Sequence, residues 1–198
     1  MEITSERVKE LRDKTGAGMM DCKKALAESG GNLDKAIEYL RKKGAATAEK
    51  RADRATNQGV VEAYIHAGGR IGAMVEINCE TDFVAKTDDF KVLARDIAMQ
   101  IAAMNPHYIS RDEVSKEKID NELEIYRTQA RNEKKPEQVI EKIADGKLEK
   151  FYQDVCLLDQ TFIKDSGKTI KDLILETTAK TGEKVTIRRY TRFHLGES

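Results

Sequence analysis

The spacing of apolar residues divides the chain into an N-terminal helical part and a longer part of mixed period. In residues 1 to 44, apolar side chains recur every three or four positions in three short runs separated by glycine-rich turns. Val8 and Leu11 mark the first run, Asn32 is placed to cap the third, and Gly44 is expected to end it. The stripes of the second and third runs contain Met19, Cys22, Ala25, Leu26, Leu33, Ala36, Ile37 and Leu40. The pattern predicts a small three-helix bundle.

The period changes after a stretch with almost no large apolar side chain. Residues 45 to 57 are rich in Ala, Lys, Glu and Arg and predict a partly helical linker. Residues 58 to 80 alternate with period two on either side of "HAGGR", which predicts a β-hairpin. Residues 87 to 104 return to helical spacing before Asn105-Pro106. The apolar face of that helix contains Phe90, Leu93, Ala94, Ile97, Ala98 and Ile101.

The C-terminal half predicts charged helices followed by a last strand. In residues 110 to 155, a first helix ends at the "NEKKP" turn, a second begins near Pro136, and Gly146 is expected to separate it from a third. The first two should form an antiparallel helical hairpin. A further helix from residue 170 precedes an alternating strand at 185 to 194. The fold class is therefore α+β, with a small antiparallel sheet covered by helices.

Composition narrows the class of protein. Lys plus Arg and Asp plus Glu number 35 each in 198 residues, so the chain lacks the basic excess of a general nucleic-acid binder. No apolar stretch is long enough to span a membrane, and "MEITSERVKELRDKTG" has no apolar region of a secretory signal. Three widely spaced cysteines, an odd number, predict a reducing, cytoplasmic location.

Candidate catalytic and ligand-binding motifs are weak. "DSGKT" at 165 to 169 resembles the end of a phosphate loop, but Phe162 stands where its first glycine belongs, so a turn and helix cap are expected. The histidines His66, His107 and His194 lie in separate elements, and no Cys pair has metal-binding spacing. We therefore expect no metal, no cofactor and no catalytic centre, which favours an interaction protein over an enzyme.

The segment "TDFV" stands between the predicted hairpin and the following helix. On the residues alone, Thr81 is a good N-cap, Asp82 suits a helix N-terminus, and Phe83 packs inward. The alternative is that the carboxylate and the ring project from the corner toward a partner protein.

Two long stretches resemble the elongation factor Ts family. "LRDKTGAGMMDCKKAL" (residues 11 to 26) and "EINCETDFVAK" (residues 76 to 86) are similar to its two signatures, and "TIRRYTRFHLGE" is similar to its closing strand. The resemblance covers nearly the whole chain and implies a ubiquitin-associated-like domain in residues 1–54, followed by an α+β core in residues 55–198. It also implies exchange of guanine nucleotide on elongation factor Tu, the GTPase that carries aminoacyl-tRNA to the ribosome.

The resemblance assigns roles to the residues of the corner. The family's matching Asp and Phe enter the GTPase domain and disturb its Mg²⁺ and phosphate sites, which implies this role for Asp82 and Phe83. Their neighbours Thr81 and Val84 belong to the same candidate contact, although the structural interpretation is retained for both.

The resemblance also points to the turn between the first two helices as a second contact with elongation factor Tu. The candidate residues are Arg12, Gly18, Met19 and Met20. On the residues alone, Arg12 would be a solvated charge, and the two methionines would more often be core than surface.

The length of the chain predicts a homodimer. Longer members of the family have two similar core halves and an inserted coiled coil, whereas this chain has room for one core and a short hairpin. It therefore resembles the short members, which pair so that two cores do the work of two halves. The sheet is the expected pairing surface.

Two other function classes remain open from the residues alone. An RNA-binding module could use Arg188, Arg189 and Arg192 with the aromatic Tyr190 and Phe193 of the last strand. A thiol enzyme could use Cys22 or Cys79, although no histidine accompanies Cys22 locally.

Overall fold

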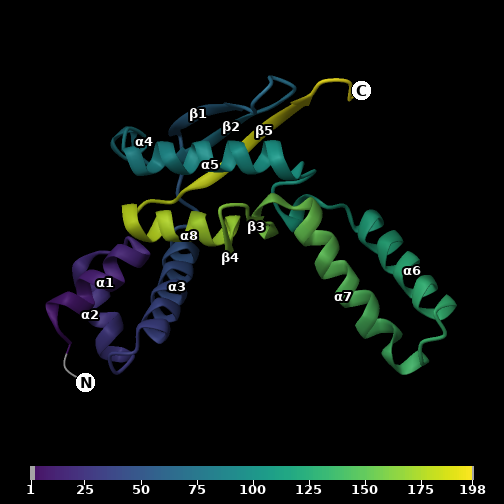
Figure 1. Cartoon of the computed structure of the whole chain (residues 1–198), viewed down its shortest axis with the longest axis horizontal. Helices are drawn as coiled ribbons and strands as arrows, with labels where there is room; N and C mark the ends of the chain where they lie inside the picture. Colours follow the sequence, from purple (N-terminus) through teal and green to yellow (C-terminus); the bar gives the residue numbers. More distant parts are fainter. Residues whose placement is uncertain (1–2, 198) are drawn as a thin grey trace.

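Three N-terminal helices form a bundle at one end of the molecule in the computed structural model, which describes residues 3–197 (Figure 1). These helices are α1 (Ser5–Thr15), α2 (Met19–Glu28) and α3 (Leu33–Lys50). The side chains of Thr4 and Asn32 cap α1 and α3, which confirms Asn32 as an N-cap. The buried core consists of Val8, Leu11, Cys22, Ala25, Leu26 and Ala36. The predicted three-helix bundle is confirmed.

The predicted end of the third helix at Gly44 is wrong, because α3 continues to Lys50. Gly44 is buried where α3 crosses α8 (Ile170–Thr181), and a β-carbon placed on it would lie 3.5 Å from Ala179 Cβ. The missing side chain allows the two helices to approach closely. Tertiary packing therefore explains this glycine better than helix termination does.

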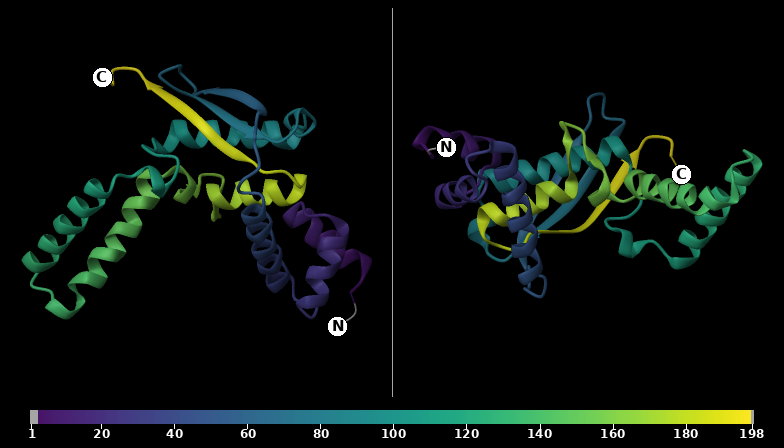
Figure 2. Two further views of the ribbon diagram at one scale, coloured as in Figure 1. Left: turned by 180° about the vertical axis from the view of Figure 1, so that it is seen from behind. Right: turned by 90° about the horizontal axis from the view of Figure 1, so that it is seen from below.

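The second part of the chain contains a three-stranded antiparallel sheet of order β1-β2-β5. The predicted hairpin is confirmed as β1 (Gln58–Ile65) and β2 (Ile71–Cys79), and the predicted last strand is β5 (Thr186–His194). Helix α5 (Asp88–Met104) lies along one face of the sheet, and no helix lies over the other face in Figures 1 and 2. The fold class is α+β.

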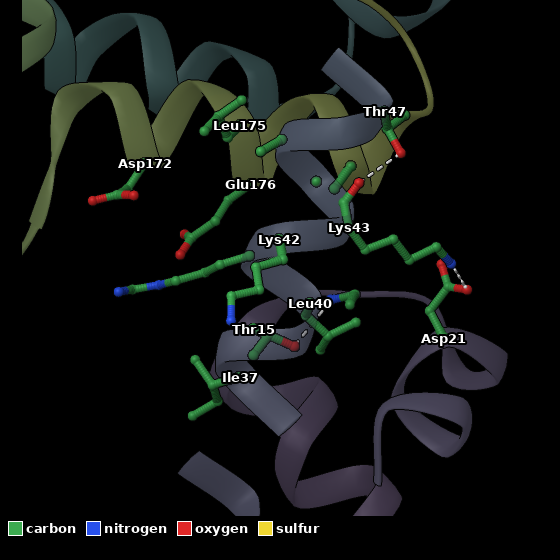
Figure 3. A pocket seen from close by; sticks show the side chains of 15 residues that line it. Thr15, Asp21, Ile37, Leu40, Lys42, Lys43, Thr47, Asp172, Leu175 and Glu176 are labelled. Carbon is green, nitrogen blue, oxygen red and sulfur yellow. Dashed lines mark hydrogen bonds and ion pairs between the residues drawn. The ribbon is translucent and has the colours of Figure 1, made fainter. Parts of the chain in front are cut away.

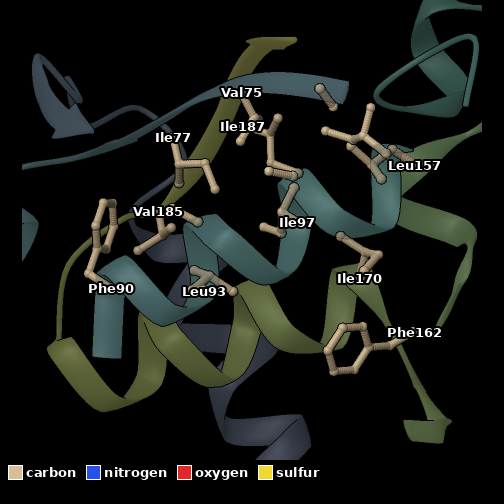
Figure 4. Packing of buried hydrophobic residues seen from close by; sticks show 14 of the residues in the cluster. Val75, Ile77, Phe90, Leu93, Ile97, Leu157, Phe162, Ile170, Val185 and Ile187 are labelled. Atoms are coloured by element: carbon tan, nitrogen blue, oxygen red, sulfur yellow. The ribbon is translucent and has the colours of Figure 1, made fainter. Parts of the chain in front are cut away.

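The main hydrophobic core lies between the sheet and α5 and continues to α8 (Figure 4). All the predicted apolar residues of α5 are buried, and Asn105 caps the helix in the left-handed conformation. Phe90 and Ile97 lie beneath Ile77 of β2, while Ile170 begins α8 on the far side of α5. The sheet, α5 and α8 thus form three layers that hold the end of β2 in place.

A long helical hairpin projects from the core (Figure 1). It consists of α6 (Lys116–Asn132) and α7 (Glu137–Val155), and a short 3-10 helix, η1 (Arg111–Glu113), precedes it. The antiparallel hairpin is confirmed, but the predicted break at Gly146 is wrong because α7 runs through it. One exposed glycine costs about 1 kcal/mol of helix stability, which the packing of α6 against α7 overcomes.

Short elements at the corner and before α8 complete the chain. These are α4 (Asp82–Ala85), η2 (Leu157–Asp159), β3 (Thr161–Phe162) and β4 (Asp165–Thr169). The β3–β4 ribbon includes the "DSGKT" segment, which was predicted as a turn and cap only. Its extended part was missed because polar residues and glycine give it no hydrophobic period.

The helix cap predicted in that segment is present. Thr169 forms a capping box with Asp172 at the start of α8. Lys168 pairs with Glu176 at 2.8 Å. The segment therefore stabilises a helix start, and its lysine is engaged within the protein.

Candidate functional site

The corner between β2 and α5 is stiffened by two successive threonine caps. Thr81 has an extended backbone and caps α4, accepting from the amide of Val84 at 3.5 Å. Thr87 caps α5 in the same way, accepting from the amide of Phe90 at 3.3 Å. Thr81 is therefore confirmed as an N-cap, and the four-residue helix α4 is held at both ends.

The corner projects one aromatic ring and one carboxylate. Phe83 is 79% exposed, so the interpretation from the residues alone that its ring packs inward is wrong, and the alternative that the ring projects from the corner agrees with the structure. Val84 packs against the main core and Ala85 is buried, so the apolar contacts of α4 are made by its second half. This leaves the ring free to contact a partner.

Asp82 is paired within the free protein. Its Oδ2 accepts from the Nζ of Lys86, one helical turn later, at 2.6 Å. This hydrogen bond from Lys86 holds the pKa of Asp82 below its usual value. The carboxylate is thus charged and held in one direction by Lys86, whose own side chain is exposed.

We expect the pKa of Asp82 to rise toward its ordinary value of about 4 when Lys86 is replaced by alanine. A lowered pKa in the folded state stabilises the fold above the unfolded pKa, and this stabilisation is lost as the pH falls through the folded pKa. Titration of the Asp82 carboxyl carbon by NMR measures the shift. Lys42→Ala, which removes a similar one-turn pair with Glu38, is the control and should leave Asp82 unchanged. An Asp82 pKa that is the same in Lys86→Ala and the parent would contradict the pairing.

The turn between α1 and α2 exposes two methionines. Met19 is 49% exposed and Met20 is 75% exposed, so the interpretation of these residues as core is wrong. They lie in the first turn of α2, which begins at its cap Gly18, and the covered part of the helix starts only at Cys22. Arg12 lies in the last turn of α1, just before this turn.

One lysine connects the turn between α1 and α2 with the start of α5. Lys180, near the end of α8, places its Nζ 2.6 Å from an Asp89 carboxylate oxygen at the start of α5. The same side chain lies against Gly16, whose β-carbon, if present, would be 3.5 Å from Lys180 Cδ. The α1–α2 turn and the α4–α5 corner therefore lie at the same end of the molecule, on either side of α8 (Figure 1). Sequence reasoning missed Lys180 because a lysine in a last helical turn normally faces solvent.

A cavity of about 290 Å³ lies beside these segments, where the N-terminal helices meet α8 (Figure 3). Ile37, Leu40 and Leu175 form part of its apolar wall. Lys43 at its rim pairs with Asp21. The contact between the three-helix bundle and the core is therefore incompletely filled next to the candidate site.

The cysteines are poor candidates for catalysis. All three are free and buried, which confirms the interpretation of Cys22 as a core residue. Burial raises the pKa of Cys79 and of Cys156 to about 11 in each case, and burial also raises the pKa of Cys22. The thiol of Cys79 donates to the carbonyl of Thr81 at 3.1 Å. It is a structural neighbour of the corner rather than an accessible nucleophile.

Alkylation tests this assignment. At pH 8, iodoacetamide should modify Cys79 in the native protein more than about a hundredfold slower than in the unfolded chain, because the thiolate is the reacting form. Mass spectrometry of the labelled peptides measures both rates, with the reaction in urea as control. Rapid native labelling of Cys79 would show that the thiol is accessible.

The last strand does not present a continuous base-stacking surface. The hydroxyl of Tyr190 donates to the carbonyl of Pro106 at 2.7 Å on the covered side of the sheet, while Phe193 is exposed on the other side. Arg189 pairs with Glu76, and Arg192 donates to the Ala102 carbonyl. These arrangements do not favour the RNA-binding alternative.

Phe83, Met19 and Met20 expose apolar side chains at one end of the molecule. Among residues 3–197, no group of His, Cys, Asp and Glu side chains could hold a metal ion. Within the same described residues, no helix is long and apolar enough to cross a membrane. The projecting ring and methionines are the chemistry that this part of the surface offers.

Comparison with known proteins assigns the family. The family described as Elongation factor TS matches residues 4–197. Elongation factor Ts of Desulforamulus reducens is 62% identical over 196 residues, 99% of this chain and 90% of that protein. The proteins of the same name from Carboxydothermus hydrogenoformans and Moorella thermoacetica are 63% and 59% identical over 195 residues, 98% of this chain and 90% and 96% of theirs. The chain belongs to the elongation factor Ts family and is a translation elongation factor.

Proposed function

We propose that this protein is a guanine nucleotide exchange factor for elongation factor Tu. It binds the GDP-bound GTPase, promotes release of GDP and holds the nucleotide-free form until GTP binds. It performs no bond-making chemistry and needs no catalytic residue, cofactor or metal of its own. The observation that carries the proposal is the 79% exposed ring of Phe83 on a doubly capped corner.

The geometry of the corner suits insertion into a partner. A large aromatic ring held in water is a typical hot-spot anchor, and it contributes most when a rigid support removes the cost of ordering it. Asp82 stands beside the ring and can exchange Lys86 for a donor on the partner. We infer that the pair spreads the elements of the GTPase domain that hold the nucleotide.

Thermodynamic linkage explains how insertion releases nucleotide. A GTPase holds its nucleotide through a phosphate loop and a Mg²⁺ ion. If insertion of Asp82 and Phe83 disturbs these contacts, the bound factor weakens GDP binding, and GDP weakens factor binding by the same ratio. The factor therefore promotes release without altering the final equilibrium between nucleotides.

A second contact steadies the complex in this proposal. The turn between α1 and α2 lies at the same end of the molecule as the corner (Figure 1). It carries Arg12, Gly18, Met19 and Met20, and both methionines are exposed. Flexible, polarizable methionines adapt well to a partner surface. Two attachment points on either side of α8 would fix the direction in which Phe83 enters the GTPase, while Thr81 and Val84 support the ring from within.

We also propose that the protein works as a homodimer built from two-part subunits. Residues 1–54 and 55–198 have separate hydrophobic clusters, which supports the division into a three-helix domain and a core domain. The uncovered face of the sheet exposes Ile65, Met74 and Phe193 around a shallow hollow of about 560 Å³. A second copy of the sheet is the occupant we propose for this face.

Release of a fluorescent GDP analogue from purified elongation factor Tu tests the function. The folded protein should accelerate release in proportion to its concentration until the GTPase is saturated. The same protein heated until unfolded is the control. A folded parent that leaves the release rate unchanged would refute the exchange function.

A further inference from the structure

The end of β2 is held by a glutamate that lies more than a hundred residues away in the sequence. Glu183 lies in the loop between α8 and β5, and its Oε2 accepts from the amides of Glu80 at 3.2 Å and Thr81 at 3.0 Å. Its Oε1 accepts from the hydroxyl of Thr81 at 2.6 Å. Three donors of the strand end are thus satisfied by one carboxylate.

The arrangement is reciprocal. Glu80 Oε1 accepts from the amide of Lys184 at 2.7 Å, and its Oε2 accepts from Arg54 Nη1 at 3.0 Å. Each glutamate therefore binds the backbone of the segment that carries the other, and we name the pair Glu80 and Glu183 the glutamate clasp. The amide of Lys184 is the main cause of the lowered pKa of Glu80.

The clasp acts directly on the cap of α4. A hydroxyl has one donor and two acceptor positions, so the hydrogen bond to Glu183 orients the oxygen of Thr81 for the amide of Val84. Asp82 and Phe83 lie between these two groups. Because the ring of Phe83 is exposed and packs on little else, its direction depends on the backbone that Glu183 holds.

We propose that Glu183 is a positioning residue for the exposed Asp82–Phe83 pair. This inference rests on the proposed exchange function, since the pair matters only if it enters a partner. Charge-assisted hydrogen bonds to backbone amides are among the stronger ones in proteins, and removing the carboxylate leaves three donors without their acceptor. The corner is then expected to become disordered while the rest of the fold stays intact.

The clasp also connects the corner to the N-terminal domain. The Nζ of Lys184 donates to the carbonyls of Ala52 and Arg54, in the segment that follows α3. Arg54, in the same segment, forms an ion pair with Glu80. The chain leaving the three-helix bundle is therefore fastened to the residues that hold the corner.

Amide hydrogen exchange in the isolated protein tests the positioning without any partner. In Glu183→Ala, the amides of residues 81 to 84 should exchange about tenfold faster, while those of β1 and α5 keep their rates. Glu183→Gln keeps the size and one acceptor oxygen, so its exchange rates at residues 81 to 84 should lie between those of the parent and those of Glu183→Ala. Glu113→Ala is the matched control, because Glu113 also accepts from a backbone amide, that of Ile109, far from the corner. Unchanged exchange at residues 81 to 84 in Glu183→Ala would overturn the proposal.

A double-mutant cycle then connects the clasp to nucleotide release. Glu183→Ala should lower the acceleration of GDP release by about tenfold in the parent and cause little further loss in a Phe83→Ala background. Equal losses in both backgrounds would mean that Glu183 acts elsewhere and would overturn the proposal. A folded parent that gives no acceleration refutes the exchange function itself, whereas the hydrogen exchange result still reports whether Glu183 holds the corner.

Discussion

Replacing Phe83 by alanine should weaken binding to elongation factor Tu by about thirtyfold or more, since a buried aromatic anchor contributes roughly 2 kcal/mol or more to a complex. The acceleration of GDP release at limiting protein should fall by the same factor. The thermal stability of the isolated protein should not change, because the ring is 79% exposed and contributes little to the core.

Titration of the variant against elongation factor Tu, with GDP release as the signal, separates weaker binding from a slower maximal rate. Asp82→Ala is measured in parallel and should reduce release by a smaller factor, because its carboxylate first has to leave Lys86. Val92→Ala removes another exposed apolar side chain, on α5, and serves as the control. Full activity of Phe83→Ala would show that the corner has only a structural role.

Replacing Phe193 by aspartate should convert a dimer into a monomer and raise its dissociation constant by more than about a hundredfold, since a buried, unpaired carboxylate costs several kcal/mol. Phe193 lies across from Gly72 in the sheet, and Met74 and Ile65 are exposed on the same face. The added charge would lie in the middle of the proposed interface between two sheets.

Light scattering measures the change directly. The parent should have twice the mass of the 22.3 kDa chain, and the variant should have the mass of one chain. Ile163→Asp places the same charge on an exposed apolar position in the β3–β4 turn, away from the sheet, and should remain dimeric. A parent with the mass of one chain would contradict the dimer.

The elements with a strong hydrophobic period could be predicted from the sequence. Helix α5 and the β1–β2 hairpin have one covered face each, so burial appears in the order of their residues. The predictions of helix ends at Gly44 and Gly146 were wrong because they considered each glycine without its tertiary contacts. A glycine favours a helix end only when nothing compensates for it. The compensating contacts come from α8, which is distant in the sequence from Gly44, and from α6, which packs against α7 across the hairpin turn.

The residues of the candidate site also fall into those that local sequence predicts and those that depend on distant contacts. The segments around Phe83 and Met20 could be identified because each is a continuous motif, and the cap at Thr81 follows from its residue type. Lys180 and Glu183 could not be identified, because a lysine or glutamate acquires its role only from the backbone that folding places next to it. The exposure of both methionines likewise depends on how far the neighbouring helices extend over the start of α2.

The pairing of β2 with β5 has a consequence for the order in which the chain folds during synthesis. Translation delivers the three-helix bundle first, and its contacts are local enough to form while the rest of the chain is still being made. The third strand of the sheet has to wait, because β5 (Thr186–His194) is made long after β2 (Ile71–Cys79). During that interval the edge of β2 that later pairs with β5 has no partner strand. An unpaired strand edge can pair with strands of other chains, which leads to aggregation. This protein is therefore expected to be most prone to aggregation before β5 has been synthesised.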